Sequence, residues 1–307
     1  RLTSADELFT IKHQPMPFVT SQRERDKSVI LNVVRKFGPL SRVEIHRLTQ
    51  LRMSAISQLT RELLAAESVV EDGLSDNPTG RKQVLLKVNP RAGFILALEF
   101  DSEEVTAAVL NLVPEIETLS KQATDRTKGT DGLVTQLKRC ARAVLRQAGV
   151  SASELRGIGI ADVGIVNRKA GVTVTSSQLD FWRDVPLVRI FEKEFGVPVV
   201  VDNATRCRGT AERFLGAGEQ AEDMVYVEYG AGIGSAIIAG GRLLDGHRTS
   251  AGEFGHTRVG AETAPCQCGS FGCLEAIAGP AAARSIVPAP ATAALMAPSR
   301  PWPAASR

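Results

Sequence analysis

The sequence predicts a mixed α/β protein in which a small helical domain precedes a larger α/β domain. Apolar residues recur at helical spacing between residues 26 and 66, and two short apolar strands follow. Farther along, strand-like pairs alternate with amphipathic helices. Charge marks the same division, because residues 23–61 hold nine Lys or Arg and three Asp or Glu, a net +6 in a chain of net charge +3. A basic block at one end is typical of nucleic-acid binding, although a solvated surface would also show it.

The first two predicted helices are defined by their ends. Helical spacing runs through residues 26–37, and Gly38-Pro39 ends this helix. Ser41 and Glu44 have the spacing of a capping box, in which each side chain bonds the backbone N–H of the other residue. A second helix is therefore expected to begin there and to continue to about residue 48.

A third helix is expected over residues 54–66, with an apolar face and an outward polar face. Two short helices joined by a tight turn, the second with an outward polar face, predict a helix-turn-helix. Hydroxyl, amide and guanidinium groups on that face are suited to bind base edges in the major groove. They belong to Ser54, Ser57, Gln58 and Arg61.

Strands are expected over residues 68–72 and 83–88, so the helix-turn-helix would carry a wing. The link between these strands places Arg81 and Lys82 at the wing tip, where they would contact phosphates or the minor groove. The alternative is a three-helix packing domain that binds no ligand.

The larger domain is expected to begin at residue 91, after a flexible tail over residues 1–22 and a winged helix-turn-helix domain over residues 23–90. Its predicted strands cover residues 94–100, 105–112, 158–161, 197–201, 224–228 and 235–239. Its predicted helices cover residues 129–148, 187–195 and 203–215. Residues 277–307 are rich in alanine and proline, which argues against a packed element there.

Composition indicates an ordinary globular protein, with 43% hydrophobic and 23% charged residues. The sequence has no apolar run long enough for a membrane span, and residues 1–22 lack the apolar core of a signal peptide. Three of the five cysteines are placed as metal ligands, which fits a reducing compartment better than a disulfide framework. We therefore expect a cytoplasmic protein.

One histidine and three cysteines gather late in the sequence: His256, Cys266, Cys268 and Cys273. Three thiolates and an imidazole make a closed, tetrahedral zinc site of the structural kind. Gly269 and Gly272 let the chain bend so that the last two sulfurs can face one ion. The sequence therefore predicts one structural Zn²⁺, and the alternative is a chance cluster of reduced cysteines.

These residues carry a family resemblance. The stretch from Glu253 to Glu275 contains Glu-Phe-Gly-His and then Cys-Gln-Cys-Gly-Ser-Phe-Gly-Cys-Leu-Glu. It resembles the zinc-binding signature of the ROK family (repressors, open reading frames, kinases). Glycine-rich stretches over residues 227–237 and 240–246 resemble the part of the signature just upstream, and the whole resemblance runs from about Asp26 to Ala278.

The resemblance implies an actin-like, two-lobed fold of the ROK sugar-kinase type over residues 91–276. Members normally continue well beyond the zinc motif, so the C-terminal part of this domain is expected to be missing, through truncation or a change of reading frame near Ala278. The resemblance also implies four ligands for sugar hydroxyls: Asn203, Glu253, His256 and Glu275. Together such groups offer the donors and acceptors that a polyol needs. For the two glutamates, structural hydrogen bonding around the zinc loop is the alternative.

The family includes sugar kinases and sugar-responsive repressors, and two stretches distinguish them here. A kinase has Asp-x-Gly-Gly-Thr after its first strand, whereas residues 99–103 read Glu-Phe-Asp-Ser-Glu, with carboxylates that would repel a polyphosphate. In the kinase motif Asn-Asp-x-Asn, Asn203 matches the Asn and Ala204 takes the place of the catalytic base. Asp202 is the alternative, displaced base.

The sequence thus predicts a repressor in which a winged helix binds operator DNA and a catalytically inactive kinase-like domain binds a sugar or sugar derivative. A homodimer or homotetramer is expected, in which sugar binding closes the lobes and alters operator affinity. The second interpretation is an active ATP-dependent sugar kinase with a DNA-binding appendage. The third is a zinc-stabilised DNA-binding protein whose second domain only oligomerises.

Overall fold

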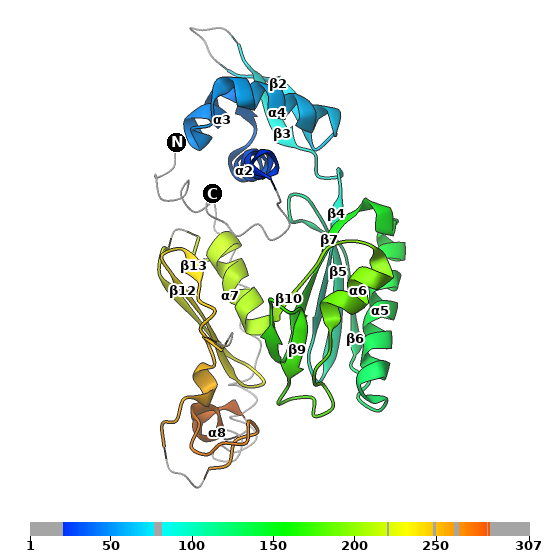
Figure 1. Cartoon of the computed structure of the whole chain (residues 1–307), viewed down its shortest axis with the longest axis vertical. Coiled ribbons are helices and arrows are strands. Elements are labelled where there is room, and N and C mark those ends of the chain that lie inside the picture. Colours follow the sequence, from blue (N-terminus) through cyan, green and yellow to red (C-terminus); the bar gives the residue numbers. More distant parts are fainter. Residues whose placement is uncertain are drawn as a thin grey trace. The chain divides into compact units, whose positions relative to one another are not determined.

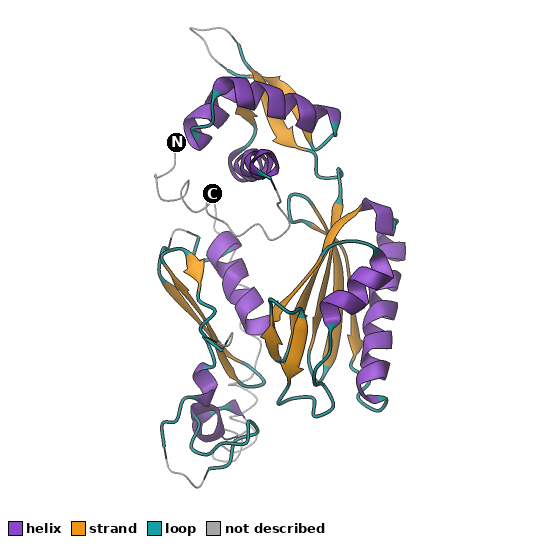
Figure 2. Cartoon of the chain, viewed as in Figure 1, coloured by secondary structure: helices purple, strands orange, loops and turns teal. Residues whose placement is uncertain are grey.

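The computed structural model describes residues 21–76, 82–219, 221–247, 250–260, 264–280 and 282. Most of its helices and strands are labelled in Figure 1, and all are coloured by type in Figure 2. The chain forms two compact units, Arg1–Asp202 and Asn203–Arg307. The first contains the N-terminal helices and a five-stranded sheet, and the second contains a three-stranded sheet and the cysteine cluster.

Three helices and a small sheet form the N-terminal part of the first unit. The helices are α2 (Gln22–Phe37), α3 (Arg42–Thr49) and α4 (Met53–Ala65). The sheet has the order β1 (Leu40–Ser41), β3 (Val84–Val88) and β2 (Val69–Leu74), with antiparallel neighbours. The three predicted helices and both predicted strands are therefore confirmed, within a few residues of their expected ends.

Local side-chain bonds fix α3 and join it to α4. Ser41 Oγ accepts from the Glu44 N–H at 3.3 Å, and Glu44 Oε2 accepts from the Ser41 N–H at 2.7 Å, so the predicted capping box is confirmed. Arg42 Nε donates to Thr60 Oγ1 at 3.0 Å, which links the two helices. The core beneath them includes four fully buried apolar residues: Ile30, Ile45, Ile56 and Leu86.

The larger part of the first unit is a five-stranded sheet of order β10-β7-β4-β5-β6. Its strands are β4 (Phe94–Phe100), β5 (Glu104–Asn111), β6 (Ile116–Ala123), β7 (Leu155–Asp162) and β10 (Val199–Asn203). The other elements are α5 (Gly129–Ala148), η1 (Ala152–Glu154), β8 (Ile165–Asn167), β9 (Val172–Thr175) and α6 (Leu187–Phe195). One apolar cluster joins the sheet to α5 and α6, so the predicted amphipathic helices bury their apolar faces as expected.

A buried carboxyl at the end of β7 was not predicted. Asp162 accepts hydrogen bonds from Gly164 N at 2.7 Å, Thr173 Oγ1 at 2.5 Å and Trp182 Nε1 at 2.9 Å. Burial raises the pKa of Asp162, although the three donors act in the opposite direction. The carboxyl ties β7 to β9 and to the loop before α6.

The second unit packs α7 (Ala204–Leu215) against a sheet of order β11-β12-β13. The strands are β11 (Met224–Tyr229), β12 (Ile233–Ala239) and β13 (Arg242–Leu243). Helix and sheet approach closely because residue 209 is glycine, and a Cβ there would lie 2.4 Å from the Ala236 Cβ. Two short helices follow, η2 (Phe254–His256) and α8 (Leu274–Ala278), which carry His256 and Glu275 of the candidate site.

Some predictions fall outside the described residues. These are residues 1–20 of the flexible tail predicted over residues 1–22, Arg81 at the wing tip, and most of the alanine- and proline-rich stretch, from residue 283 onward. The last two residues of the predicted tail were assigned wrongly, because Ser21 caps α2 and Gln22 is its first residue. Within the described part of the chain, no helix combines the length and the apolar character that crossing a bilayer requires.

Candidate functional site

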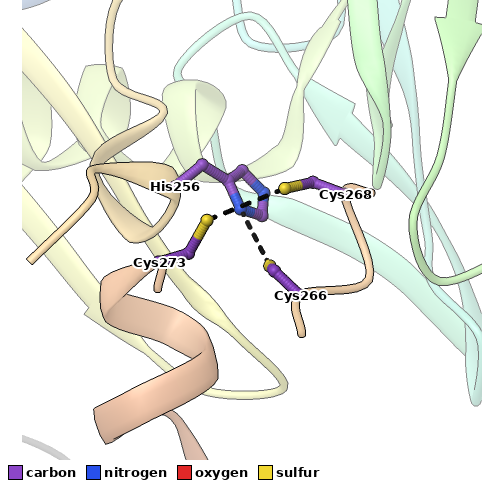
Figure 3. A group of neighbouring side chains, drawn as sticks. All are labelled: His256, Cys266, Cys268 and Cys273. Carbon is purple, nitrogen blue, oxygen red and sulfur yellow. Dashed lines mark hydrogen bonds between the residues drawn. The ribbon is translucent and has the colours of Figure 1, made fainter. Parts of the chain in front are cut away.

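The four predicted metal ligands meet in the second unit. One ligand atom from each of His256, Cys266, Cys268 and Cys273 lies within 4.8 Å of all the others (Figure 3). His256 Nδ1 is 3.5 Å from Cys266 Sγ, and the sulfurs of Cys268 and Cys273 are 3.8 Å apart. Metal–sulfur bonds of about 2.3 Å in a tetrahedron put two sulfurs about 3.8 Å apart, whereas a disulfide needs about 2.0 Å. The cluster therefore has the donor set and spacing of a four-coordinate metal site.

Backbone hydrogen bonds place these side chains. His256 ends the short helix η2, and Cys273 is the buried residue just before α8. Between them, Gly269 N donates to the Cys266 carbonyl at 3.0 Å, and Gly269 has a φ of +87°, which glycine adopts without strain. The tight turn brings Cys266 and Cys268 back toward Cys273, as the predicted bend required.

The electrostatics of the cluster also favour a cation. Burial and the neighbouring thiols raise the pKa of Cys266 to about 11. At neutral pH this thiol would keep its proton unless a cation offset the charge of the thiolate. A divalent metal supplies that charge, so the four residues fit the group that their spacing predicted.

The predicted sugar ligands all belong to the second unit, and three of them interact. Glu253 Oε2 lies 3.8 Å from His256 Nε2. Burial raises the pKa of Glu253 and the charge of Glu275 raises it further, whereas His256 and Arg206 act in the opposite direction. The Glu253 and Glu275 carboxyls and the imidazole therefore share one polar region beside the cysteine cluster.

Asn203 and Glu275 also have structural bonds. Asn203 Oδ1 accepts from the Arg206 N–H at 3.3 Å and caps α7. Glu275 Oε2 accepts from the Ile233 N–H at 2.7 Å, close to Gly232, where a Cβ would lie 2.2 Å from that oxygen. Glu275 therefore has the structural role that the sequence analysis gave as the alternative. This bond uses Oε2, so it is compatible with a ligand role for Oε1.

Sequence reasoning missed Arg206, a buried guanidinium in the first turn of α7. Its Nη2 lies 2.6 Å from Asp245 Oδ1. A signal was available, because a cation near a helix N-terminus opposes the helix dipole and needs an anionic partner elsewhere.

The region that binds phosphate in kinases of this fold type is acidic here. Asp101 Oδ1 accepts from the N–H groups of Glu103 and Glu104 at 2.7 and 2.8 Å, so the turn between β4 and β5 binds its own carboxylate. Ala204, at the position of the base, is buried at the start of α7. Asp202, the displaced alternative, forms an ion pair with Arg168 at 3.1 Å.

The predicted base-reading face of α4 is largely open. Ser54, Gln58 and Arg61 are exposed, Ser57 is half-buried, and Lys82 before β3 is exposed. On the side toward α2, Glu62 pairs with Lys27 at 3.0 Å and also with Arg23. Glu62 comes directly after the basic residues 23–61, so its ion pairs neutralise part of the positive charge of that stretch within the domain.

The chain belongs to the ROK family, whose sequence pattern matches residues 95–294. A xylose repressor from Caldicellulosiruptor bescii is 29% identical over 270 residues, which cover 87% of this chain and 67% of that one. The chain spans about two thirds of the length of the curated repressors it matches.

Two crystal structures extend the comparison. A ROK family transcriptional regulator, described as a homolog of the Escherichia coli Mlc protein, shares the fold with a TM-score of 0.72 at 23% identity over 96% of this chain and 69% of that chain. A ROK family glucokinase from Streptomyces griseus, bound to glucose and AMPPNP, has a TM-score of 0.57 at 28% identity, covering 66% of this chain and 64% of its own. The regulator is matched over more of the chain, including the region before residue 95.

Proposed function

We propose that this chain is a transcriptional repressor in which a winged helix-turn-helix binds operator DNA and the ROK domain binds a sugar without phosphorylating it. Two features found in one chain carry the proposal. An exposed polar helix face, α4, precedes a ROK domain that has Ala204 in place of the catalytic base. Similarity to xylose repressors supports it.

For DNA, α4 acts as the recognition helix and lies in the major groove. The exposed Gln58 and Arg61 face base edges, and Ser54 lies one helical turn before Gln58. The β2–β3 hairpin is the wing, with Lys82 and Arg81 at the phosphates. Arg42, through its bond to Thr60, keeps α3 and α4 in a fixed relation, so the recognition helix approaches the groove as a rigid element.

For the sugar, we assign hydroxyl contacts to Asn203, Glu253, His256 and Glu275. The metal is Zn²⁺, because three thiolates and one imidazole in a tetrahedral arrangement suit that ion. Zinc on His256 Nδ1 would fix the ring and leave Nε2 directed toward Glu253 and the sugar. Xylose and glucose are the first candidates, since similar proteins are a xylose repressor and a glucose-bound kinase.

Control of DNA binding follows from a population shift. A sugar that binds one arrangement of the domains better than the other shifts the equilibrium toward it, by no more than the difference in binding free energy. In a homodimer or homotetramer, that shift alters the spacing of two winged helices and hence the fit to two half-sites. The protein acts in the cytoplasm, where the DNA and the sugar are both present.

The test uses the full chain and DNA selected by that chain from a random library. Anisotropy titrations with the selected DNA and a scrambled control are run with and without xylose or glucose. We expect a salt-dependent affinity that favours the selected DNA and changes with one of the sugars. A chain that binds both DNAs equally, or none at any salt concentration, contradicts the repressor function.

An active sugar kinase is the second candidate, and its support is the 28% identity to the glucose-bound kinase. Against it stand the acidic turn at Asp101 and the ion pair of Asp202 with Arg168. An ADP-release assay distinguishes the two candidates.

A further inference from the structure

Arg206 combines deep burial with a set of bonds to one neighbouring segment. Its side chain is 4% exposed. Nη1 donates to the Leu244 carbonyl at 2.6 Å and to the Ala251 carbonyl at 3.4 Å, and Nη2 donates to Asp245 Oδ1 at 2.6 Å. The acceptors flank the stretch that leads from β13 to Glu253. A buried guanidinium is costly unless its donors are satisfied, so these bonds hold both sides of that stretch on α7.

The same stretch is also bonded to β12. Ser235 donates to the Gly252 carbonyl through its N–H at 3.0 Å and through Oγ at 3.1 Å. Ala251 N donates to the Asp245 carbonyl at 3.2 Å, which closes the stretch on itself. Gly252 has a φ of +102°, so the chain turns sharply just before Glu253.

Arg206 also bonds Asn203, another of the proposed sugar ligands. Its backbone N–H donates to Asn203 Oδ1 at 3.3 Å, and this bond orients the Asn203 side chain at the start of α7. The backbone of one residue thus fixes Asn203, while its guanidinium fixes the chain that enters Glu253.

We propose that Arg206 is a positioning residue of the sugar pocket, which sets Glu253 relative to Asn203 and so determines which arrangement of hydroxyls fits between them. The proposal rests on the sugar-binding function proposed above. It requires the fork geometry of arginine, because a lysine ammonium at this position could not reach both Asp245 and the two carbonyls.

A second buried arginine on α7 provides a matched control. Arg213 is 6% exposed and donates from Nη1 to the carbonyls of Glu219 at 2.7 Å and Gly218 at 3.4 Å. It holds a loop that bears none of the proposed sugar ligands. Arg213→Lys and Arg206→Lys therefore make the same chemical change at two equally buried places.

The experiment is calorimetry of the full chain and its variants with xylose and glucose, together with metal content and hydrogen exchange. Arg206→Lys should weaken binding of the preferred sugar about tenfold, equal to about 1.4 kcal/mol, whereas Arg213→Lys should change it less than about twofold. Arg206→Lys should also speed exchange of the amides around residues 250–257, while the metal stays bound. If Arg206→Lys fails to fold, Asp245→Asn replaces it, because Asp245 is an accessible partner of Arg206. Asp245→Asn should weaken sugar binding about threefold.

A double-variant cycle separates positioning from a general loss of structure. If Arg206 acts through Glu253, Arg206→Lys should cost almost nothing further in a Glu253→Gln background. Equal losses in the Arg206 and Arg213 variants, or full additivity with Glu253→Gln, would overturn the positioning role while leaving sugar binding intact. A wild-type chain that binds neither sugar would instead overturn the sugar-binding function and, with it, this role of Arg206.

Discussion

The imidazole of His256 lies between Cys266 and the Glu253 carboxylate: Nδ1 is 3.5 Å from the sulfur, and Nε2 is 3.8 Å from Glu253 Oε2. The ring therefore belongs to the metal cluster and to the candidate sugar pocket at once. A metal bound at Nδ1 would fix the ring plane and leave the Nε2–H group to donate a hydrogen bond to Glu253 or to a sugar hydroxyl. Loss of the metal should consequently affect sugar binding, because both use the same ring.

The first prediction concerns the metal. The purified chain should contain one zinc, and Cys268→Ser should lose it, lower the melting temperature and weaken sugar binding, because a structural zinc site contributes directly to folding. Metal analysis and thermal unfolding with and without a chelator measure this. Cys207→Ser, outside the cluster, is the control and should keep its zinc. Zinc far below one per chain in the wild type would contradict the assignment.

The second prediction separates the pocket from the metal. Glu253→Gln should weaken sugar binding by about 1.5–3 kcal/mol, the usual worth of a hydrogen bond to a charged group. Its zinc should remain, since Glu253 is not one of the four clustered ligands. Calorimetry with xylose and glucose, combined with metal analysis, tests both parts. A variant that binds sugar normally would assign Glu253 to structural bonding alone.

The third prediction concerns phosphoryl transfer. With ATP and a panel of hexoses and pentoses, the wild-type chain should release no ADP above background, because Ala204 cannot accept a proton and the turn at Asp101 repels phosphate. A coupled ADP-release assay checks this. Turnover that Asp202→Asn abolishes would support the kinase interpretation instead. Asp180 is exposed in the loop between β9 and α6, so Asp180→Asn is the control for a nonspecific effect.

Sequence patterns predicted the elements that carry strong periodicity. The helix over residues 129–148 was predicted with the bounds that the structure shows, because one apolar stripe faces the sheet. β6 and the short strands β1, β8, β9 and β13 were missed. β6 has no buried residue, so the alternation that identifies a half-buried strand is weak there, and pairing with β5 defines it instead.

The candidate site was predictable only in part for a similar reason. The metal ligands lie within eighteen residues of one another and have a recognisable spacing, so His256 and Cys273 could be joined from sequence alone. Arg206 and Asp245 are 39 residues apart, and no local pattern records their pairing. Glu62 shows the same limit, since its partners Arg23 and Lys27 lie on another helix.

The fourth prediction concerns DNA. Arg61 is exposed on α4, one helical turn after Ser57, where a guanidinium can reach a guanine edge. Such a contact is worth about 1–3 kcal/mol of discrimination. Lys82 is exposed beside the wing and should bind phosphate, which carries no sequence information. Arg61→Ala should therefore weaken binding to selected DNA far more than binding to scrambled DNA, while Lys82→Ala should weaken both alike.

Salt dependence distinguishes the two roles independently of affinity. Loss of a phosphate contact at Lys82, or at Arg81 in the same wing, should make the negative slope of log K against log salt shallower by about one unit. Titrations of each variant at several salt concentrations measure slope and specificity ratio together. Arg146→Ala, an exposed arginine on α5, is the control and should change neither. If Arg61→Ala leaves the specificity ratio unchanged, α4 does not read sequence through Arg61, because a lost base contact must reduce the preference for the selected site.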